Sequence, residues 1–109
     1  MISLTVLYPK TAESHFDMAY YLQKHVPLVQ KRLSPLGLVQ IELEEGVAGG
    51  APDTKAGFAV IGRLYFPAIE DLQKALAAHG PELIGDIPNF TDVPPQMQVS
   101  RLLDVPAPV

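Results

Sequence analysis

Residues 38–66 have the sequence LVQIELEEGVAGGAPDTKAGFAVIGRLYF, and this stretch decides the fold. Its first part, residues 38–45, alternates apolar and polar side chains, which is the pattern of a half-buried β-strand. Residues 46–56 contain three glycines and one proline and indicate a loop. Residues 56–66 are more apolar and predict a second strand, so the stretch forms an antiparallel pair joined by a hairpin-like loop.

A strand and a helix are predicted before this pair. Residues 2–8 alternate apolar and polar side chains and indicate the strand. Residues 16–33 predict the helix, with Ser14 or Asp17 placed to cap its start. Pro27 interrupts the helical pattern, so we expect either a kink or two shorter helices, with Pro27 in the first turn of the second. The apolar stripe of this helix consists of Ala19, Leu22, Val26, Val29 and Leu33.

A second helix and a last strand are predicted after the pair. Pro67 opens the helix and Gly80 ends it. We expect a turn over residues 81–85 and an irregular loop over residues 86–92, followed by a strand over residues 96–102. The order β-α-β-β-α-β predicts an α+β, ferredoxin-like fold, with a four-stranded antiparallel sheet and both helices on one face.

The chain is short and weakly charged. Its 109 residues predict one domain, residues 1–103, followed by a proline-rich C-terminal tail, residues 104–109. The net charge is −4, and there is no cysteine and no basic cluster. This composition argues against disulfides, thiolate metal sites and nucleic-acid binding. Because no signal segment and no apolar run of ~20 residues are apparent, we expect a cytoplasmic protein without membrane contact.

The sheet face without helices is the predicted interaction surface. It mixes apolar and polar side chains, so we expect a homodimer formed face to face, the alternative being a solvated face. The residues predicted on this open face are Ser3, Thr5, Leu7, Gln40, Glu42, Ala59, Ile61, Arg63, Tyr65, Gln98 and Ser100.

His25 is the main candidate for chemistry. It lies at the edge of the predicted apolar stripe, where an imidazole can act as a general acid or base near neutral pH. The alternative is a structural histidine that bonds to the backbone. Tyr8 ends the first strand on the side that faces the helices, so its hydroxyl is placed near the same cleft. Asn89 is a candidate ligand contact, although such residues also shape their own turns.

The three histidines do not form a metal-binding motif. His15 and Asp17 supply two ligands at most, and helix capping explains Asp17 equally well. His79 lies at the predicted end of the second helix, where the helix dipole favours a cation. We therefore predict no metal and no cofactor.

Two stretches of the sequence are similar to short EthD-like proteins. One is F-D-x-x-Y-Y-L-x-x-H-x-P-L-V over residues 16–29, and the other is GDIPNFTD over residues 85–92. The resemblance covers roughly residues 1–103 and implies a dimeric α+β barrel. The EthD family is named for a protein associated with degradation of ethyl tert-butyl ether. Related barrels include cofactor-free monooxygenases, muconolactone isomerase, polyketide cyclases and haem-binding proteins. The histidine of the first string corresponds to His25.

The leading hypothesis combines the candidate residues with the resemblance to EthD-like proteins. A small, mostly apolar organic molecule binds in a helix–sheet cleft, and His25 acts as general acid or base in a lyase, isomerase or cyclase-type step of a catabolic pathway. Whether the protein is an enzyme stays open. The alternatives are a non-catalytic binding or accessory protein of a degradation pathway, and a haem-binding or cofactor-free monooxygenase-type barrel. The predicted ligand contacts are Tyr8, Met18, Tyr21, Val29, Asn89 and Phe90.

Overall fold

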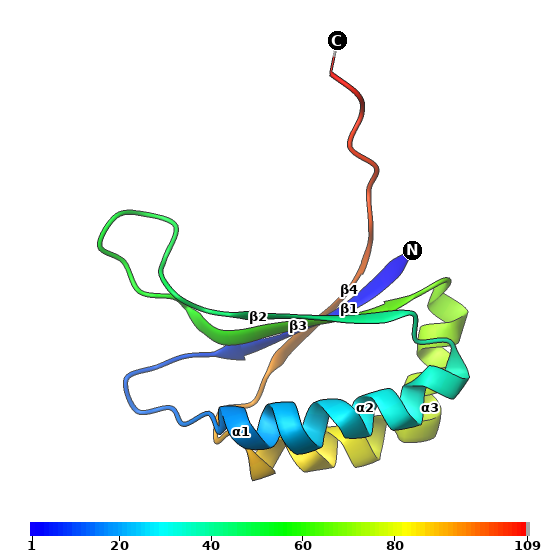
Figure 1. Cartoon of the computed structure of the whole chain (residues 1–109), viewed down its shortest axis with the longest axis horizontal. Coiled ribbons are helices and arrows are strands. Elements are labelled where there is room, and N and C mark those ends of the chain that lie inside the picture. Colours follow the sequence, from blue (N-terminus) through cyan, green and yellow to red (C-terminus); the bar gives the residue numbers. More distant parts are fainter. Residues whose placement is uncertain (109) are drawn as a thin grey trace.

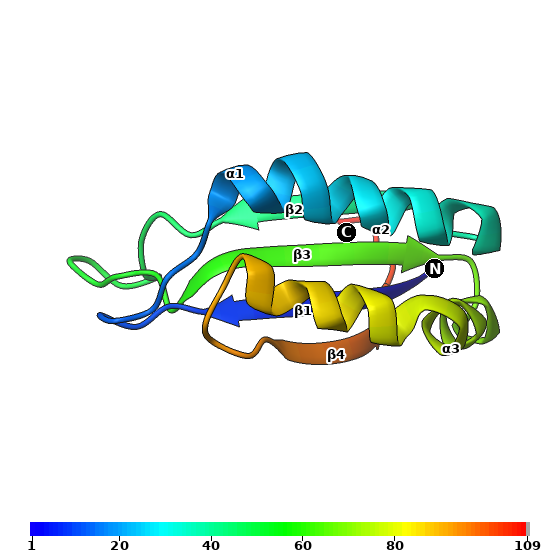
Figure 2. The ribbon, with the colours of Figure 1, turned by 90° about the horizontal axis from the view of Figure 1, so that it is seen from below.

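The computed structural model describes residues 1–108, so Val109 of the predicted tail lies outside the described residues. One antiparallel sheet has the strand order β2-β3-β1-β4. Two helical segments lie side by side on one face of this sheet (Figure 1, Figure 2), which confirms the predicted ferredoxin-like α+β fold. The strands are β1 (Ile2–Pro9), β2 (Gln40–Glu45), β3 (Phe58–Phe66) and β4 (Gln96–Arg101).

The first helical segment contains a wide turn immediately before its proline. It consists of α1 (Met18–Tyr20), the π turn η1 (Tyr21–His25), α2 (Val26–Leu33) and the 3₁₀ turn η2 (Ser34–Leu36). In the π turn the backbone N–H of Val26 donates to the carbonyl of Tyr21, five residues earlier. Pro27 lies in the first turn of α2. Proline has no N–H to donate, so the helical bonds are reorganised at this point, as the second of the two alternatives for this helix predicts.

The π turn changes which side chains this segment buries. Val29 and Leu33 are buried as predicted, whereas Ala19 and Leu22 are exposed, so their assignment to the buried stripe is wrong. The prediction assumed 3.6 residues per turn throughout and did not include the wider turn. The side chains before that turn therefore point in a different direction, relative to the sheet, from the one predicted. The buried positions of the segment are consequently four residues apart: Tyr21, His25, Val29 and Leu33.

The second helix, α3 (Ile69–Asp86), is longer than the sequence predicts. The predicted end at Gly80 and the predicted turn over residues 81–85 are both wrong, because the helix continues through Pro81. An interior proline removes one backbone hydrogen bond. The apolar face of the helix nevertheless continues past that point to the buried Leu83, and this packing against the sheet overrides the local signals.

Both ends of α3 also differ from the prediction. The helix begins at Ile69 with Ala68 as its N-cap, so Pro67 precedes the helix rather than opening it. After Asp86 the chain continues into a 3₁₀ turn, η3 (Ile87–Asn89), within the predicted loop. Thr91 then forms an isolated antiparallel bridge with Phe16, which joins this loop to the start of the first helical segment.

The residues between helices and sheet form two clusters. One is aliphatic and centres on Leu33, Phe66 and Leu72. The other is rich in aromatic side chains and includes Tyr8, Tyr21 and Phe90. It lies near the C-terminal end of β1, where the start of the first helical segment meets the end of α3.

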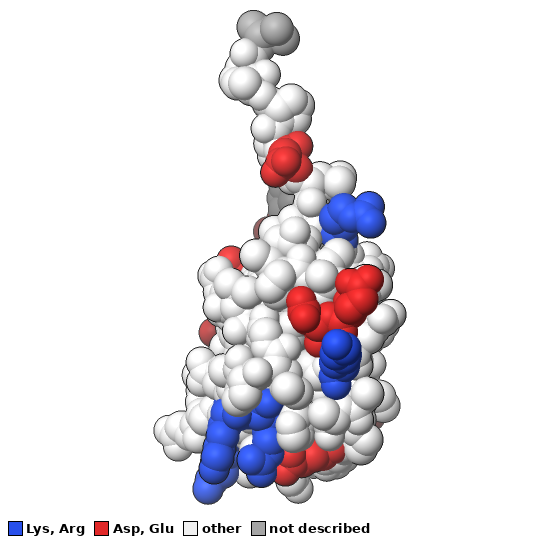
Figure 3. All heavy atoms as spheres, turned by 90° about the vertical axis from the view of Figure 1, so that its right-hand side faces the viewer, with Lys and Arg blue, Asp and Glu red and all other residues white. Residues whose placement is uncertain are grey.

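The open face carries the predicted residues in register. Ser3 is paired with Tyr65 and Ser100, and Thr5 is paired with Arg63 and Gln98. The tail extends from the sheet on the side opposite the helices (Figure 1), and residues 102–108 are exposed. Positive and negative side chains are interspersed on the end of the molecule in Figure 3. No helix of residues 1–108 has the length and apolarity needed to cross a membrane.

Candidate functional site

His25 is paired with a carboxylate from the other helical segment. The side chain lies at the end of η1 and the residue is only 6% exposed. Its Nδ1 lies 2.9 Å from Oδ2 of Asp86, the last residue of α3. An ionised carboxylate can only accept hydrogen bonds, so Nδ1 carries the proton and donates it to Asp86. In the neutral imidazole this leaves Nε2 as the unprotonated nitrogen.

Asp86 accepts hydrogen bonds from three side chains. Besides His25, Oη of Tyr20 donates to its Oδ1 at 2.7 Å, and Nδ2 of Asn89 donates to the same oxygen at 2.9 Å. Burial alone would raise the pKa of Asp86, but the bonds from Tyr20, His25 and Asn89 outweigh burial and hold the pKa below its ordinary value. Asp86 is therefore ionised at neutral pH and fixes the orientation of the imidazole.

Backbone contacts explain why these two distant segments meet. The backbone N–H of Asp17 donates to the carbonyl of Phe90 at 2.7 Å. The backbone N–H of His15 donates to Oδ1 of Asp92, and Oγ1 of Thr91 donates to the carbonyl of His15, both at 2.8 Å. These three bonds join the start of the first helical segment to the chain that follows α3, and so place His25 beside Asp86.

A cavity of about 280 Å³ lies between the helices and the sheet, beside His25. This main cavity is lined by fourteen residues of β1, β3, β4, η1, α2, α3 and η3. Of these, only Tyr8 and His25 have a side-chain nitrogen or oxygen, and none has a charged carboxylate, ammonium or guanidinium group. Its volume is near the lower end for small-molecule sites, and its lining suits an apolar molecule with few polar groups.

A side pocket of about 50 Å³ adjoins the main cavity. Tyr21 lines this pocket together with Gly62 of β3. A Cβ atom at Gly62 would lie 3.0 Å from Oη of Tyr21, so the glycine leaves room for the tyrosine hydroxyl against the sheet. Five residues line both spaces: Val6, Tyr8, His25, Val29 and Leu64.

Three polar atoms are free to contact a molecule in these spaces. They are Nε2 of His25 and the hydroxyls of Tyr8 and Tyr21, none of which bonds to residues 1–108. Every fully buried side-chain nitrogen or oxygen in that range has a hydrogen-bond partner. These three atoms have none, so they are not fully buried, and they are accessible from the cavities that they line. Burial raises the pKa of Tyr21 to about 12, and burial together with Tyr21 raises the pKa of Tyr8 still further. Both hydroxyls are therefore neutral donors at physiological pH.

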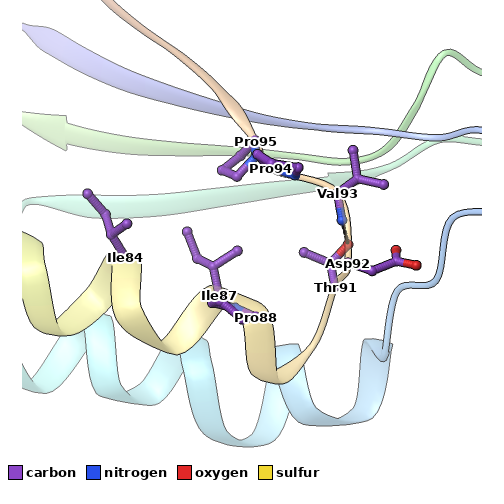
Figure 4. A pocket seen from close by; sticks show the side chains of 8 residues that line it. All are labelled: Ile84, Ile87, Pro88, Thr91, Asp92, Val93, Pro94 and Pro95. Carbon is purple, nitrogen blue, oxygen red and sulfur yellow. Dashed lines mark hydrogen bonds between the residues drawn. The ribbon is translucent and has the colours of Figure 1, made fainter.

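A groove on the surface adjoins the main cavity. This groove encloses about 310 Å³ and shares Ile84 and Ile87 with the cavity. Figure 4 shows Ile84 of α3 and Ile87 of η3 both pointing from the helical layer toward the strands, while the carboxylate of Asp92 points away from them. Ile84 and Ile87 therefore form a wall that the surface groove and the main cavity share.

The sequence and the fold are similar to those of a solved EthD-like protein from Ralstonia eutropha JMP134. The two chains are 35% identical, with 91% of this chain and 88% of that chain covered and a TM-score of 0.84. This chain belongs to the EthD family. An EthD family protein from Bacillus halodurans C-125 is 20% identical over 94% of this EthD chain and 99% of its own, with a TM-score of 0.66.

More distant structures share the fold of this EthD protein. A dimeric ferredoxin-like protein from an uncultured marine organism is 14% identical, covers 100% of this chain and 99% of its own, and has a TM-score of 0.53. The chain therefore has the fold of the dimeric α+β-barrel class. No family model and no curated protein matches the sequence.

The structure of this EthD protein brings four of the predicted site residues together around the two cavities: Tyr8, Tyr21, His25 and Val29. Phe90 packs behind the imidazole, with a ring-centre distance of 4.6 Å, and Asn89 contacts His25 only through Asp86. Met18 lines a separate hollow beside Lys10. Among residues 1–108, no three or more histidines or carboxylates are grouped to hold a metal ion.

Two residues of the site, Asp86 and Tyr20, were not predicted from the sequence. Asp86 and Tyr20 are 66 residues apart, and nothing in the local pattern joins them. Tyr20 lies within the EthD-like stretch over residues 16–29 and Asp86 within that over residues 85–92, and this membership is a signal that could have drawn attention to them. It marks the stretches but does not indicate which side chain pairs with His25.

Proposed function

We propose that this EthD protein binds a small, uncharged, mostly apolar organic molecule in the main cavity, and that His25 acts on it as general acid or base. One observation carries the proposal: the bond from Nδ1 to Asp86 leaves Nε2 accessible in a space whose walls are otherwise apolar. A lining without charged groups favours a neutral ligand, because an ion there would lose its hydration without a partner.

The same geometry supports acid–base chemistry without a cofactor. Nε2 of neutral His25 takes a proton from the bound molecule, and the carboxylate of Asp86 stabilises the imidazolium that forms. The neutral hydroxyls of Tyr8 and Tyr21 donate hydrogen bonds to an oxygen that gains negative charge in the same step. Proton removal and return of this kind supports a lyase, isomerase or cyclase-type reaction, which we place in a catabolic pathway, in the cytoplasm.

The experiment first identifies the ligand and then tests the histidine. Native mass spectrometry of the untreated protein identifies the molecule that co-purifies, and turnover of that molecule is compared in wild type, His25→Ala and His15→Ala. His15 is exposed and lines neither cavity, which makes it a matched control. We expect His25→Ala to lose about 10²-fold or more in kcat and His15→Ala to retain wild-type activity. Equal turnover in all three proteins contradicts a catalytic His25.

The alternative is a non-catalytic binding or accessory protein of a degradation pathway. The apolar lining supports it equally well, since only two lining residues of the main cavity offer a polar atom. It predicts that the co-purified molecule raises Tm in wild type and in His25→Ala alike, without conversion to product.

We also propose a homodimer formed through the open face of the sheet. Figure 1 shows that no element of this chain covers that face, and the exposed tail extends on the same side. On this face Nη1 of Arg63 lies 2.6 Å from Oε1 of Glu44 and 3.7 Å from Oε1 of Glu42. The guanidinium group of Arg63 is therefore already paired within one chain. Sedimentation velocity at micromolar concentration tests the dimer, and a single species with the mass of one chain contradicts it.

A further inference from the structure

Gly80 occupies a position in α3 where a glycine is costly. It is buried in the interior of an 18-residue helix, and its backbone φ is negative. A negative φ is open to every residue type. A glycine in a helix interior is less favourable than an alanine, because it loses more conformational freedom on folding. The one local reason for a glycine is Pro81, because the proline ring disfavours a Cβ atom on the residue that precedes it in a helix. Apart from Pro81, the backbone gives no reason for a glycine here.

Close packing gives no reason either. Apart from its two chain neighbours and the backbone of its own helix, a Cβ atom added at Gly80 would have one heavy atom within 4 Å, the Cβ of Leu76 at 3.8 Å, which is an ordinary contact. Gly62 is different, because a Cβ atom there would lie 3.0 Å from Oη of Tyr21. The protein itself therefore has room for a side chain at Gly80.

The free space around Gly80 belongs to the main cavity. Gly80 lines it together with Leu76 and Ile84, which lie four residues before and after it on the same face of α3. A larger side chain at Gly80 would occupy volume that is now empty. We infer that the missing side chain at Gly80 keeps the cavity open, and that Gly80 sets the size of the molecule that binds. This inference depends on the proposed binding function.

Gly85 provides a matched control in the same helix. It is exposed, lines neither cavity, and an added Cβ atom there would have no heavy atom within 4 Å. Only Gly80 precedes a proline, so the two alanine variants also differ in local strain against the ring of Pro81. That strain is measured as a difference in Tm, and the effect of the cavity is measured as a difference in Kd. The variants are Gly80→Ala, Gly80→Leu, Gly85→Ala and Gly85→Leu.

The binding probe is 1-aminoanthracene, a neutral apolar fluorophore, titrated into each protein while its emission is followed. We expect Gly80→Leu to raise Kd about tenfold or more, Gly80→Ala to raise it less, and both Gly85 variants to bind as wild type. We also expect Gly85→Ala to raise Tm, since it replaces a glycine in a helix, and Gly80→Ala to raise it less, because the new Cβ meets the ring of Pro81.

The outcomes separate this inference from the function on which it depends. If wild type does not bind the probe, the proposed apolar site is contradicted, together with the role of Gly80. If wild type binds it and Gly80→Leu binds equally well, only the role of Gly80 is overturned. Should Gly80→Leu fail to fold, the alanine pair decides, and equal Kd values for Gly80→Ala and Gly85→Ala overturn the inference.

Discussion

Nδ1 of His25 lies 2.9 Å from Oδ2 of Asp86, although 61 positions of the chain separate the two residues. The bond joins the π turn of one helical segment to the last residue of the other. Tyr20 and Asn89 donate to the second oxygen of the same carboxylate. A single side chain thus fixes the imidazole and connects the two helical segments at this end of the molecule.

Replacing Asp86 by Asn tests this carboxylate. The change removes a charged acceptor of three hydrogen bonds, so we expect the free energy of unfolding at pH 7 to fall by about 1–3 kcal/mol. The folded pKa of Asp86 lies below its ordinary value of 3.8, so its stabilisation is present above that value and is lost as the pH falls through the lower folded pKa. Urea unfolding between pH 2 and 7 should show the variant and wild type converging at the acid end.

Asp104→Asn is the control for that measurement, because Asp104 lies in the exposed tail. It should have the stability of wild type at every pH. A difference between Asp86→Asn and wild type that stays constant down to the lowest pH argues against the ionised carboxylate.

The four tyrosines predict an unusual alkaline titration. The folded pKa of Tyr21 is raised to about 12 and that of Tyr8 further, so the stabilisation from their neutral forms is present below about pH 10 and is lost as the pH rises through 12. Absorbance at 295 nm should therefore show fewer than four ionised tyrosines at pH 11. Tyr8→Phe should remove part of the late phase, whereas ionisation of all four with a common midpoint near pH 10 disagrees with the structure.

Two leucines of the first helical segment test the π turn. Leu33 is fully buried and Leu22 is 50% exposed. We expect Leu33→Ala to lower the free energy of unfolding by about 2–5 kcal/mol and Leu22→Ala to change it by no more than about 0.5 kcal/mol. Chemical denaturation of both variants checks this. Similar losses would favour the regular helix that the sequence pattern predicts.

Truncation of the tail tests its contribution to the proposed dimer. Residues 104–108 are exposed in the single chain, so removing residues 104–109 should leave the unfolding of the monomer unchanged. If the tail contacts a second copy, the shortened protein should dissociate at a higher concentration than the full chain in sedimentation velocity. Identical dissociation of the two proteins excludes the tail from the interface.

The strands were predictable because their signals are local. The pattern predicted strands over residues 38–45 and 56–66 because it depends only on which side chains face the helices, and β2 and β3 lie within these ranges. The end of α3 was not predictable in this way. Gly80 and Pro81 are local signals for a helix end. The helix nevertheless continues, because Leu83 packs into the cluster between the helices and the sheet, and this contact is not visible in the local sequence.

The candidate site was predictable only in part. Tyr8 and Val29 lie on faces that periodicity predicts to point inward. His25 was expected only at the edge of the apolar stripe and Tyr21 outside it, and the π turn brings both inward, so that all four residues line the cavities. The partner of His25 could not be identified, because the meeting of the two segments depends on tertiary backbone bonds such as that from Asp17 to Phe90. Periodicity describes one segment at a time and contains no information about such contacts.

The strand order β2-β3-β1-β4 leaves β2 and β4 as the two edges of the sheet. β2 carries Glu42, Glu44 and Glu45, so two copies that met along this edge would bring like charges together. β4 is short, with six residues, and three of them are glutamine or serine. Lateral growth of the sheet into fibrils is therefore disfavoured by the chain itself, even at high protein concentration.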